Sequence, residues 1–274
     1  DAASSWEACY TEVLVSAGFT QGVFTPCVFR KGQVVVTVHG DDFTMTGPDK
    51  ELEEAEEMMR RRFDVKVQNL DPTRTGEEMI VLNRRVLVTQ EGYEYTPDGK
   101  HTKKVLVELG LEAEDCKGSL VTGSKPTATL EDDDLRRRPL DEERSHWYRS
   151  VAATLNYMAM DRPDIGFAVK ELCRNMSRPT EEDVVKLKKL GRYLVAVGNV
   201  SVTFKWFSSL TRVDGFSDSD FAGSKDRTST SGGVILLGGT LIKSWSKQQK
   251  VIALSSGEAE LYGAVKVGSE LLGI

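Results

Sequence analysis

The sequence predicts an α+β fold: a hairpin-bearing sheet with helices, then a helical segment, then a mixed sheet. The first observation behind this prediction is a β-branched run at residues 34–38, followed by a Gly-Asp-Asp turn and a second alternating run. That pattern is typical of a tight β-hairpin. The second is helical periodicity over residues 145–197, and the third is the return of alternating apolar residues after residue 201. Strands and helices in separate stretches are typical of α+β domains.

The composition is that of an ordinary globular chain, with 274 residues, 39% of them hydrophobic and 28% charged. This length accommodates one large or two ordinary domains. No apolar run is long enough to span a membrane and no signal peptide is visible, so we expect no membrane partner. The chain begins with Asp rather than Met, and we interpret it as a fragment of a longer protein.

Charge and cysteine content limit the classes of function. The net charge of −6 does not indicate nucleic-acid binding, although acids gathered round a metal would lower the total without removing a basic groove. The four cysteines lie far apart and the three histidines show no ligand spacing with them. We therefore expect reduced intracellular thiols and no zinc site.

Residues 1–114 alternate between helices and strands. A capping box at residues 4–7 opens a first helix that ends at Gly18. Asp49 caps a second helix over residues 50–63, and Pro97 begins a third that reaches Leu109. Besides the acidic hairpin at 34–47, the expected strands are residues 27–30, 64–69, 79–89 and 93–96, with the last two joined at Glu91-Gly92.

Residues 115–144 show little apolar periodicity and contain an acidic triplet at 132–134 and a basic triplet at 136–138. We expect a surface linker with solvated triplets. Helices are expected over residues 145–161, 165–176 and 181–197. The last of them carries a basic cluster formed by Lys186, Lys188, Lys189 and Arg192. This cluster fits either contact with a nucleic-acid backbone or an ordinary exposed helix face.

The last part of the chain, residues 201–274, alternates again. The expected strands are residues 202–206, 213–218, 232–237 and 240–246, the last two joined by Gly238-Gly239. Ser255-Ser256 then caps a final helix. A meander of strands followed by a helix is the first half of a mixed-sheet domain.

Two adjacent acids, Asp41 and Asp42, are expected at or beside the tip of the first hairpin. Adjacent carboxylates repel each other unless a cation lies between them. A divalent metal that also binds phosphate oxygens fits this place. An ordinary solvated turn is the alternative, because Asp is among the commonest turn residues.

A second group of acids joins the end of a strand to the start of the final helix. Asp218 and Asp220 share one face if the strand continues that far. At about 100° per residue, Glu258 and Glu260 flank the apolar stripe of the helix equally, so the helix phase leaves both open. The stripe consists of Leu261, Ala264, Val265, Gly268 and Leu272. The alternative explanation is that acids are favoured at a helix N-terminus by its dipole.

Several stretches resemble the Pol polyprotein of copia-like long-terminal-repeat retrotransposons, in the same order and over nearly the whole chain. His39-Gly40-Asp41-Asp42 occupies the place of the Tyr-Val-Asp-Asp box of the reverse transcriptase in that family. The stretches similar to its connection segment are residues 148–150, 162–165, 167–169, 176–180 and 192–194. The stretches similar to the opening strands and first helix of its RNase H are residues 215–223, 227–233, 245–249 and 253–262.

The resemblance implies a partial polymerase palm and thumb over residues 1–114, a linker over 115–144, a helical connection over 145–200, and the N-terminal half of an RNase H-like mixed-sheet domain over 201–274. It implies that Asp41 and Asp42 are catalytic metal ligands of an RNA-directed DNA polymerase. It likewise implies that Asp218 and Glu260 are catalytic metal ligands of RNase H, with Asp220 and Glu258 as the rival positions.

The same resemblance implies Mg²⁺ or Mn²⁺ as the cofactor. The implied partners are an RNA template, a DNA primer, an RNA–DNA hybrid and deoxynucleoside triphosphates. The implied location is intracellular, in a cytoplasmic particle of the element with passage to the nucleus.

The sequence departs from the family pattern at the first site, where His39 and Gly40 replace Tyr and Val. His39 changes the surface under the primer end, and Gly40 relaxes the turn. The first polymerase Asp and the last two RNase H acids of the family have no counterpart in these residues, so we expect that the isolated chain catalyses neither reaction. Two other hypotheses remain: a non-enzymatic remnant that binds nucleic acid through the basic cluster, and an inert relic.

Overall fold

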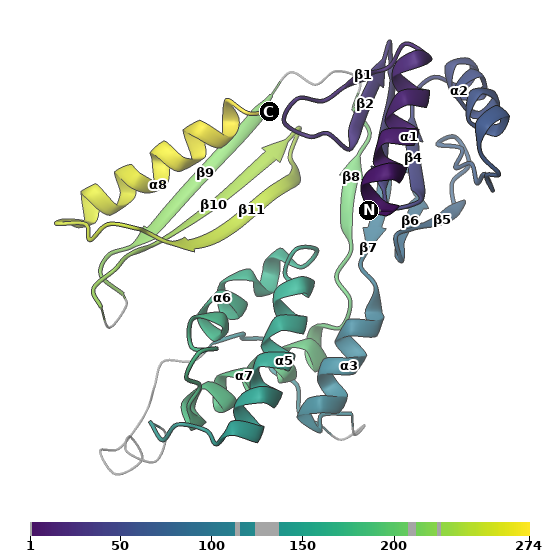
Figure 1. Cartoon of the computed structure of the whole chain (residues 1–274). Helices are drawn as coiled ribbons and strands as arrows, with labels where there is room; N and C mark the ends of the chain where they lie inside the picture. The colour runs from purple at the N-terminus through teal and green to yellow at the C-terminus, as the bar shows by residue number, and fades with distance from the viewer. Residues whose placement is uncertain (1, 113–115, 124–136, 208–211, 224–225) are drawn as a thin grey trace. The chain divides into compact units, whose positions relative to one another are not determined.

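The computed structural model describes residues 2–112, 116–123, 137–207, 212–223 and 226–274. It divides into two compact units, Asp1–Leu70 and Asp71–Ile274. Helices and antiparallel sheets occur in both units (Figure 1), which confirms the predicted α+β class. None of the helices in the described ranges is both long and apolar enough to cross a bilayer.

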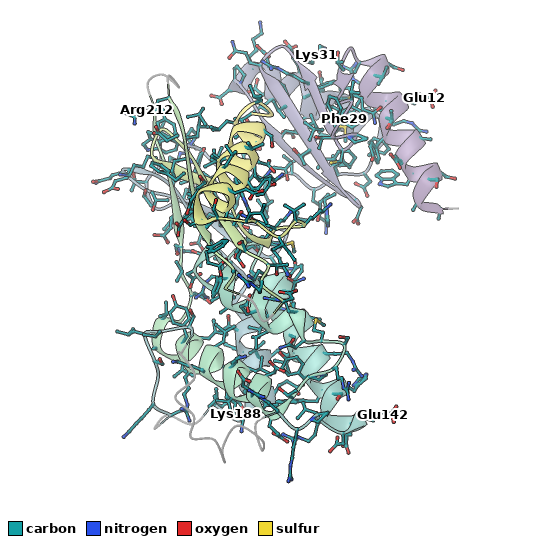
Figure 2. All side chains as sticks on the ribbon, turned by 90° about the vertical axis from the view of Figure 1, so that its left-hand side faces the viewer. Glu12, Phe29, Lys31, Glu142, Lys188 and Arg212 are labelled. Carbon is teal, nitrogen blue, oxygen red and sulfur yellow. The ribbon has the colours of Figure 1, made fainter. Side chains whose placement is uncertain are left out.

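The first unit is a four-stranded antiparallel sheet with two helices on one face. Its strands lie in chain order, β1-β2-β3-β4. The elements are α1 (Ala2–Ser16), β1 (Thr20–Gln21), β2 (Val28–Lys31), β3 (Val34–His39), β4 (Asp42–Thr46) and α2 (Asp49–Arg62). Alternate residues of β3 point to the helices, and Val36 packs with Leu14 of α1 and Met59 of α2. Phe29 of β2, labelled in Figure 2, lies in the same core.

Three details of the first unit differ from the prediction. Helix α1 begins at Ala2 rather than at the capping box, and Pro48 rather than Asp49 is the N-cap of α2. The strand predicted for residues 64–69 is absent from the described structure. Its alternation has another cause: Phe63 and Val65 pack against the core, while the Val65 carbonyl accepts a hydrogen bond from Arg60 at 3.3 Å. Apolar alternation therefore served packing here and not strand pairing.

The second unit opens with a sheet whose last strand comes from a distant part of the chain. Its elements are β5 (Glu78–Val81), β6 (Arg84–Val88), β7 (Gly92–Thr96) and β8 (Val202–Lys205), in the order β5-β6-β7-β8. The strand predicted over 79–89 is interrupted by a turn at Leu82-Asn83, both with positive φ, as a type I′ turn requires. Leu is a poor signal for such a turn, which is why the sequence pattern missed it. Strand β8 joins this sheet and not the last one.

A helical layer lies between β7 and β8 in the sequence. It consists of α3 (Gly99–Leu109), α5 (Glu142–Met158), the short 3₁₀ helix η1 (Pro163–Ile165), α6 (Gly166–Arg174) and α7 (Glu181–Val197). Its core includes Tyr148, Leu155, Leu172 and Leu190, all essentially inaccessible to solvent. Helix α7 has the predicted bounds, because Thr180 and Asp183 form a capping box at its start.

The predicted linker is described only in part. Residues 116–123 contain no helix or strand, and the Ser119 amide donates to the Arg192 carbonyl of α7 at 3.0 Å. This contact agrees with a segment wrapped on the surface. The acidic triplet at 132–134 lies outside the described residues, as does the first residue of the basic triplet. Helix α5 already begins at Glu142, so the last predicted linker residues are helical.

The third sheet carries the final helix on one face. Strands β9 (Val213–Asp220), β10 (Thr230–Leu237) and β11 (Thr240–Gln248) form an antiparallel meander in the order β11-β10-β9, and α8 (Ser256–Leu271) follows. The predicted meander followed by a helix is confirmed, and the ladders among the described strands of this sheet are all antiparallel.

The face by which α8 packs differs from the apolar stripe seen in the sequence. The buried side consists of Ala259, Gly263 and Val267. Leu261, Val265 and Leu272 of the stripe are exposed, Leu272 to 92%. Small residues explain the choice, because an added Cβ at Gly215 of β9 would lie 2.5 Å from Val267. The helix therefore approaches the sheet closely only on its small-residue side.

Candidate functional site

The first pair of acids lies at the tip of the β3–β4 hairpin. His39 pairs with Asp42 across the ladder, which leaves Gly40 and Asp41 as a two-residue turn. Gly40 has φ +63°, a conformation that glycine adopts without strain. Both Asp41 and Asp42 are exposed. The predicted place of the two carboxylates is confirmed, whereas metal binding by them stays a prediction.

A tryptophan from another element holds this turn. The indole Nε1 of Trp6 in α1 donates to the Gly40 carbonyl at 2.7 Å. Its ring packs edge-on against Phe43 and Phe63, with centroids 6.1 and 5.3 Å away. Residue 6 lies within the predicted capping box of the first helix, but contact of Trp6 with the hairpin was not predicted. The available signal was the indole N–H, which seeks a partner when the ring is buried.

The alternation of β4 sets the direction of Asp42. Phe43 packs into the core beneath the helices, so its neighbour Asp42 points to the opposite face of the sheet. His39, the ladder partner of Asp42, is exposed as well. The hairpin thus presents the Asp42 carboxylate and the His39 imidazole on a face that neither helix covers.

In the second group of acids, the structure separates the two glutamates. The Glu260 Oε1 accepts a hydrogen bond from the Ser219 amide of β9 at 3.2 Å. Glu258 is occupied at the helix start, where it accepts from the Leu254 amide at 2.7 Å and from the Tyr262 hydroxyl at 2.8 Å. These two hydrogen bonds lower the pKa of Glu258, and the bond from the Leu254 amide has the larger effect. Glu260 is therefore the glutamate that lies at the strand.

The geometry of α8 explains this difference. With Gly263 at the centre of the buried side, Glu260 is turned from the sheet by about 60° and Glu258 by about 140° at 100° per residue. The two glutamates appeared equivalent in the sequence because the exposed stripe, rather than the small residues, served as the reference.

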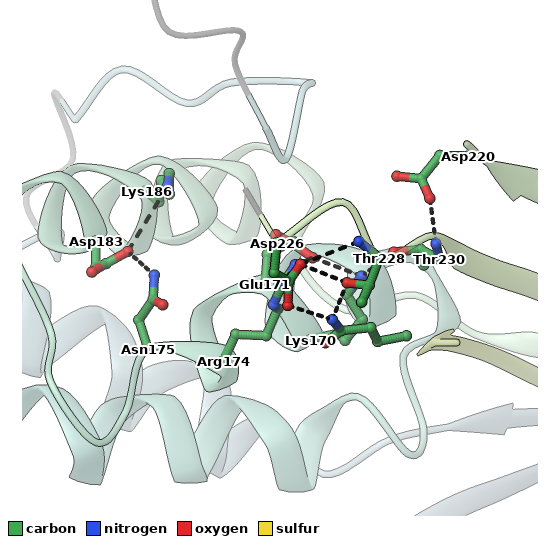
Figure 3. Close-up of polar contacts among 11 residues, drawn as sticks. Lys170, Glu171, Arg174, Asn175, Asp183, Lys186, Asp220, Asp226, Thr228 and Thr230 are labelled. Atoms are coloured by element: carbon green, nitrogen blue, oxygen red, sulfur yellow. Dashed lines mark hydrogen bonds and ion pairs between the residues drawn. The ribbon is translucent and has the colours of Figure 1, made fainter. Parts of the chain in front are cut away.

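The two aspartates of β9 also have different surroundings, and Figure 3 shows those of Asp220. Asp220 accepts a hydrogen bond from the Thr230 amide, and its carboxylate lies against Gly223, where an added Cβ would be 2.1 Å from Oδ2. The Thr230 hydroxyl in turn accepts from Lys170 of α6 at 2.9 Å. Asp220 thus closes the β9–β10 connection, although it is exposed, as Asp218 is.

Asp218 is a residue of β9, whereas Glu260 approaches this strand from α8. Ser217 faces α8, since it lies 3.6 Å from the position of a Cβ on Gly263. Alternation then directs Asp218 to the other face of the strand. Glu260 meets the backbone at Ser219, the residue after Asp218. The structure therefore places the Glu260 carboxylate at Ser219, the residue after Asp218 in β9.

The chemistry of both acid groups fits a hard divalent cation, because carboxylate oxygens are the preferred ligands of Mg²⁺ and Mn²⁺. Within the described ranges, no group of three or more His, Cys, Asp or Glu side chains is arranged to hold a metal. The candidate ligands are Asp41 with Asp42 in the first group and Asp218 with Glu260 in the second.

The basic cluster of α7 is accessible. Lys186, Lys188 and Arg192 are exposed and Lys189 is half-buried; Lys188 is labelled in Figure 2. Lys186 forms an ion pair with Glu182 at 2.7 Å. An acidic first turn at Glu181–Asp183 limits the positive surface to the later part of the helix.

The chain is similar to three curated polyproteins over 97% of its own length. It is 29% identical to the retrovirus-related Pol polyprotein from transposon RE1 and 28% identical to that from transposon RE2, both of Arabidopsis thaliana. It is 26% identical to the retrovirus-related Pol polyprotein from transposon TNT 1-94 of Nicotiana tabacum. The chain covers 18%, 18% and 20% of these relatives, respectively. No family model matches the chain, and no solved structure matches it.

Proposed function

Because the chain belongs to the Pol polyproteins of copia-like retrotransposons, we propose that it contributes halves of two phosphoryl-transfer sites. The first, at the β3–β4 hairpin, belongs to an RNA-directed DNA polymerase. The second, at β9 and α8, belongs to a ribonuclease H. The chain spans about a fifth of its curated relatives, so the substrates and partners given below are part of the proposal.

The observation that supports this function best is the Asp41–Asp42 pair on a turn fixed by Trp6. In the proposed polymerase, Asp41 and Asp42 hold Mg²⁺ or Mn²⁺ at the primer end. The bound metal would supply activation of the primer 3′-hydroxyl and neutralisation of the leaving pyrophosphate. The residues of this chain contribute orientation, since the hairpin places both carboxylates on one rigid tip. The substrates would be an RNA template, a DNA primer and deoxynucleoside triphosphates.

The second proposed site acts on an RNA–DNA hybrid. Glu260, which contacts the Ser219 amide, and the exposed Asp218, the preceding residue of β9, would hold the metal that supports hydrolysis of the RNA strand. Asp220 and Glu258 are engaged in local structure, which favours Asp218 and Glu260 as the ligands. We propose that the isolated chain catalyses neither reaction, because a pair of carboxylates retains strongly hydrated Mg²⁺ weakly.

A Mn²⁺ titration followed by NMR tests the metal sites. We expect paramagnetic broadening of amide signals centred on Asp41–Asp42 and on Ser219. The double variant Asp41→Asn/Asp42→Asn should lose the first centre and keep the second, whereas Asp218→Asn should do the reverse. Asp49→Asn, at an acid of the first turn of α2, is the matched control. Broadening of the amide signals that stays the same after these substitutions would contradict the proposal.

Nucleotide incorporation tests the proposed inactivity. The purified chain is supplied with a primed RNA template, Mg²⁺ and radiolabelled deoxynucleotide, and we expect no extended primer. Extension that disappears in Asp42→Asn would show that the chain is a complete polymerase.

A second candidate function rests on the exposed basic cluster of α7. As a non-enzymatic remnant, the chain would bind nucleic acid through Lys188 and Arg192. Such binding would weaken with salt and survive the Asp41→Asn/Asp42→Asn change. Loss of binding in Lys188→Glu/Arg192→Glu, with retention in Lys103→Glu on α3, would support this function.

A further inference from the structure

Gln249 links three segments of the third sheet at one side chain. It follows β11 directly, within the stretch at residues 245–249 that has no part in the acid groups, and it is 9% exposed. Its Nε2 donates to the Ser231 hydroxyl of β10 and to the Ala259 carbonyl of α8, both at 2.8 Å. Its own amide donates to the Ser229 carbonyl at 2.8 Å.

The side-chain amide is held by its donors. A carbonyl oxygen only accepts, so the nitrogen end of Gln249 must face Ala259. Among the described residues, Oε1 has no hydrogen-bond partner. A buried acceptor without a partner costs free energy, and an apolar side chain of similar size would avoid that cost. The two N–H groups are therefore the feature that this position requires.

Apart from the bond at Ser219 and an ion pair between Lys243 of β11 and Glu270 near the end of α8, small side chains form much of the interface between α8 and the sheet. Gly263 lies over Ser217 and Ser231, and Gly215 lies under Val267. Such small side chains permit close approach but interlock weakly, so they resist sliding and rotation poorly. A shift of one residue moves a helix about 1.5 Å along its axis and turns it by about 100°. A directional hydrogen bond to the helix backbone opposes both motions.

The bond from Gln249 reaches the helix at Ala259, the residue before Glu260. Glu260 then accepts from the Ser219 amide of β9. We propose that Gln249 is a positioning residue that sets the axial place and rotation of α8, so that Glu260 and not Glu258 lies at Ser219, the residue after Asp218 in β9. Only the use of Glu260 as a metal ligand rests on the proposed function; its placement at β9 does not.

Substitution of Gln249 by Leu tests the placement. The Gln249→Leu variant keeps the volume and removes both donors and the unpaired acceptor. We expect the exchange rate of the Ser219 amide to rise by about three- to tenfold, as the loss of a hydrogen bond of ordinary net strength implies, and the chemical shift of the Glu260 carboxyl carbon to change. Gln248→Leu is the matched control, because that side chain contacts Asp226 and Thr228 instead. It should leave both signals unchanged.

The outcomes separate this inference from the proposed function. Unchanged Ser219 and Glu260 signals in Gln249→Leu, whether or not stability falls, would overturn the positioning role. Changed signals together with no Mn²⁺ binding at Ser219 in the unmodified chain would support the positioning role and refute the metal site. Binding of Mn²⁺ that weakens in Gln249→Leu but not in Gln248→Leu supports both.

A measurement on the unmodified chain covers the case in which Gln249→Leu does not fold. The side-chain NH₂ protons of Gln249 should exchange more slowly than those of Gln248. Both NH₂ protons of Gln249 are hydrogen-bonded inside the buried interface between α8 and the sheet. Equal exchange rates for the two glutamines would contradict the proposal.

Discussion

The two acid groups are built in different ways. At the hairpin, Asp41 and Asp42 are neighbours in sequence, and a two-residue turn brings them together. At the third sheet, Glu260 and Ser219 are 41 residues apart and meet only because α8 packs on β9. A local pair survives as long as its turn forms, whereas a long-range pair depends on every contact that seats the helix. The second site should therefore be far more sensitive to substitutions away from the acids.

The largest effect should come from a buried ion pair in the second unit. Arg162 is 2% exposed, donates to Asp164 at 2.7 and 2.9 Å, and also binds the Gly198 carbonyl at the end of α7. Arg162→Ala leaves Asp164 and Gly198 without this partner, and we expect a loss of about 3 kcal/mol from the second unit. Hydrogen exchange in increasing urea should show the hairpin of the first unit unchanged.

Arg144 provides the control for this experiment. It pairs with Glu181 but its side chain is 44% exposed, so Arg144→Ala should cost at most about 1 kcal/mol. Equal losses from both variants would argue against a special role for the buried pair.

The next largest effect concerns the packing of α8 on β9. An added Cβ on Gly215 would lie 2.5 Å from Val267 and 2.8 Å from Leu271, so Gly215→Ala forces the helix away. We expect a loss of about 1–3 kcal/mol and faster exchange of the Ser219 amide, with no change at Asp41. Gly268→Ala is the matched control. No described heavy atom lies within 4 Å of its added Cβ, and it should stabilise α8 by up to about 1 kcal/mol.

A smaller effect is expected at the hairpin. Trp6→Phe keeps an aromatic ring but removes the donor to the Gly40 carbonyl, which should cost about 1 kcal/mol and shift the amide signals of Gly40 and Asp41. Trp147→Phe is the control in the second unit, where the indole donates to Glu108 at 3.3 Å. A change at Asp41 in Trp147→Phe but not in Trp6→Phe would contradict the proposed support of the turn.

The smallest effect is a pH dependence of helix α8. Glu270 of α8 accepts from Lys243 of β11 and from Lys266, and these bonds lower its pKa from 4.5 to about 2. Because the folded pKa is the lower one, the stabilisation is complete above pH 4.5 and is lost as the pH falls through about 2. Amide exchange of α8 measured between pH 5 and 2 should show this loss (a range that brackets the two pKa values). Glu270→Gln should weaken the dependence and leave the part due to Glu258, whose pKa is also lowered, and an unchanged profile would refute the assignment.

Short-range features were predictable from the residues. The run at Val34–His39 followed by Gly40 indicated the hairpin, and helical periodicity indicated α7 over residues 181–197. These features depend on side chains within a few positions of one another, so their pattern is visible in the sequence. The turn at Leu82-Asn83 was missed because Leu rarely adopts positive φ and carries no turn signal.

The sequence alone therefore determined the α+β class, the place of Asp41 and Asp42, and the resemblance to a transposon polyprotein. The pairing of β8 with β7, the buried side of α8 and the choice of Glu260 over Glu258 emerged only in the folded chain. Each of these depends on contacts between residues far apart in sequence. Such contacts are selected by close packing and by hydrogen bonds across an interface, such as that between Gln249 and Ala259, and neither has a signature in local periodicity.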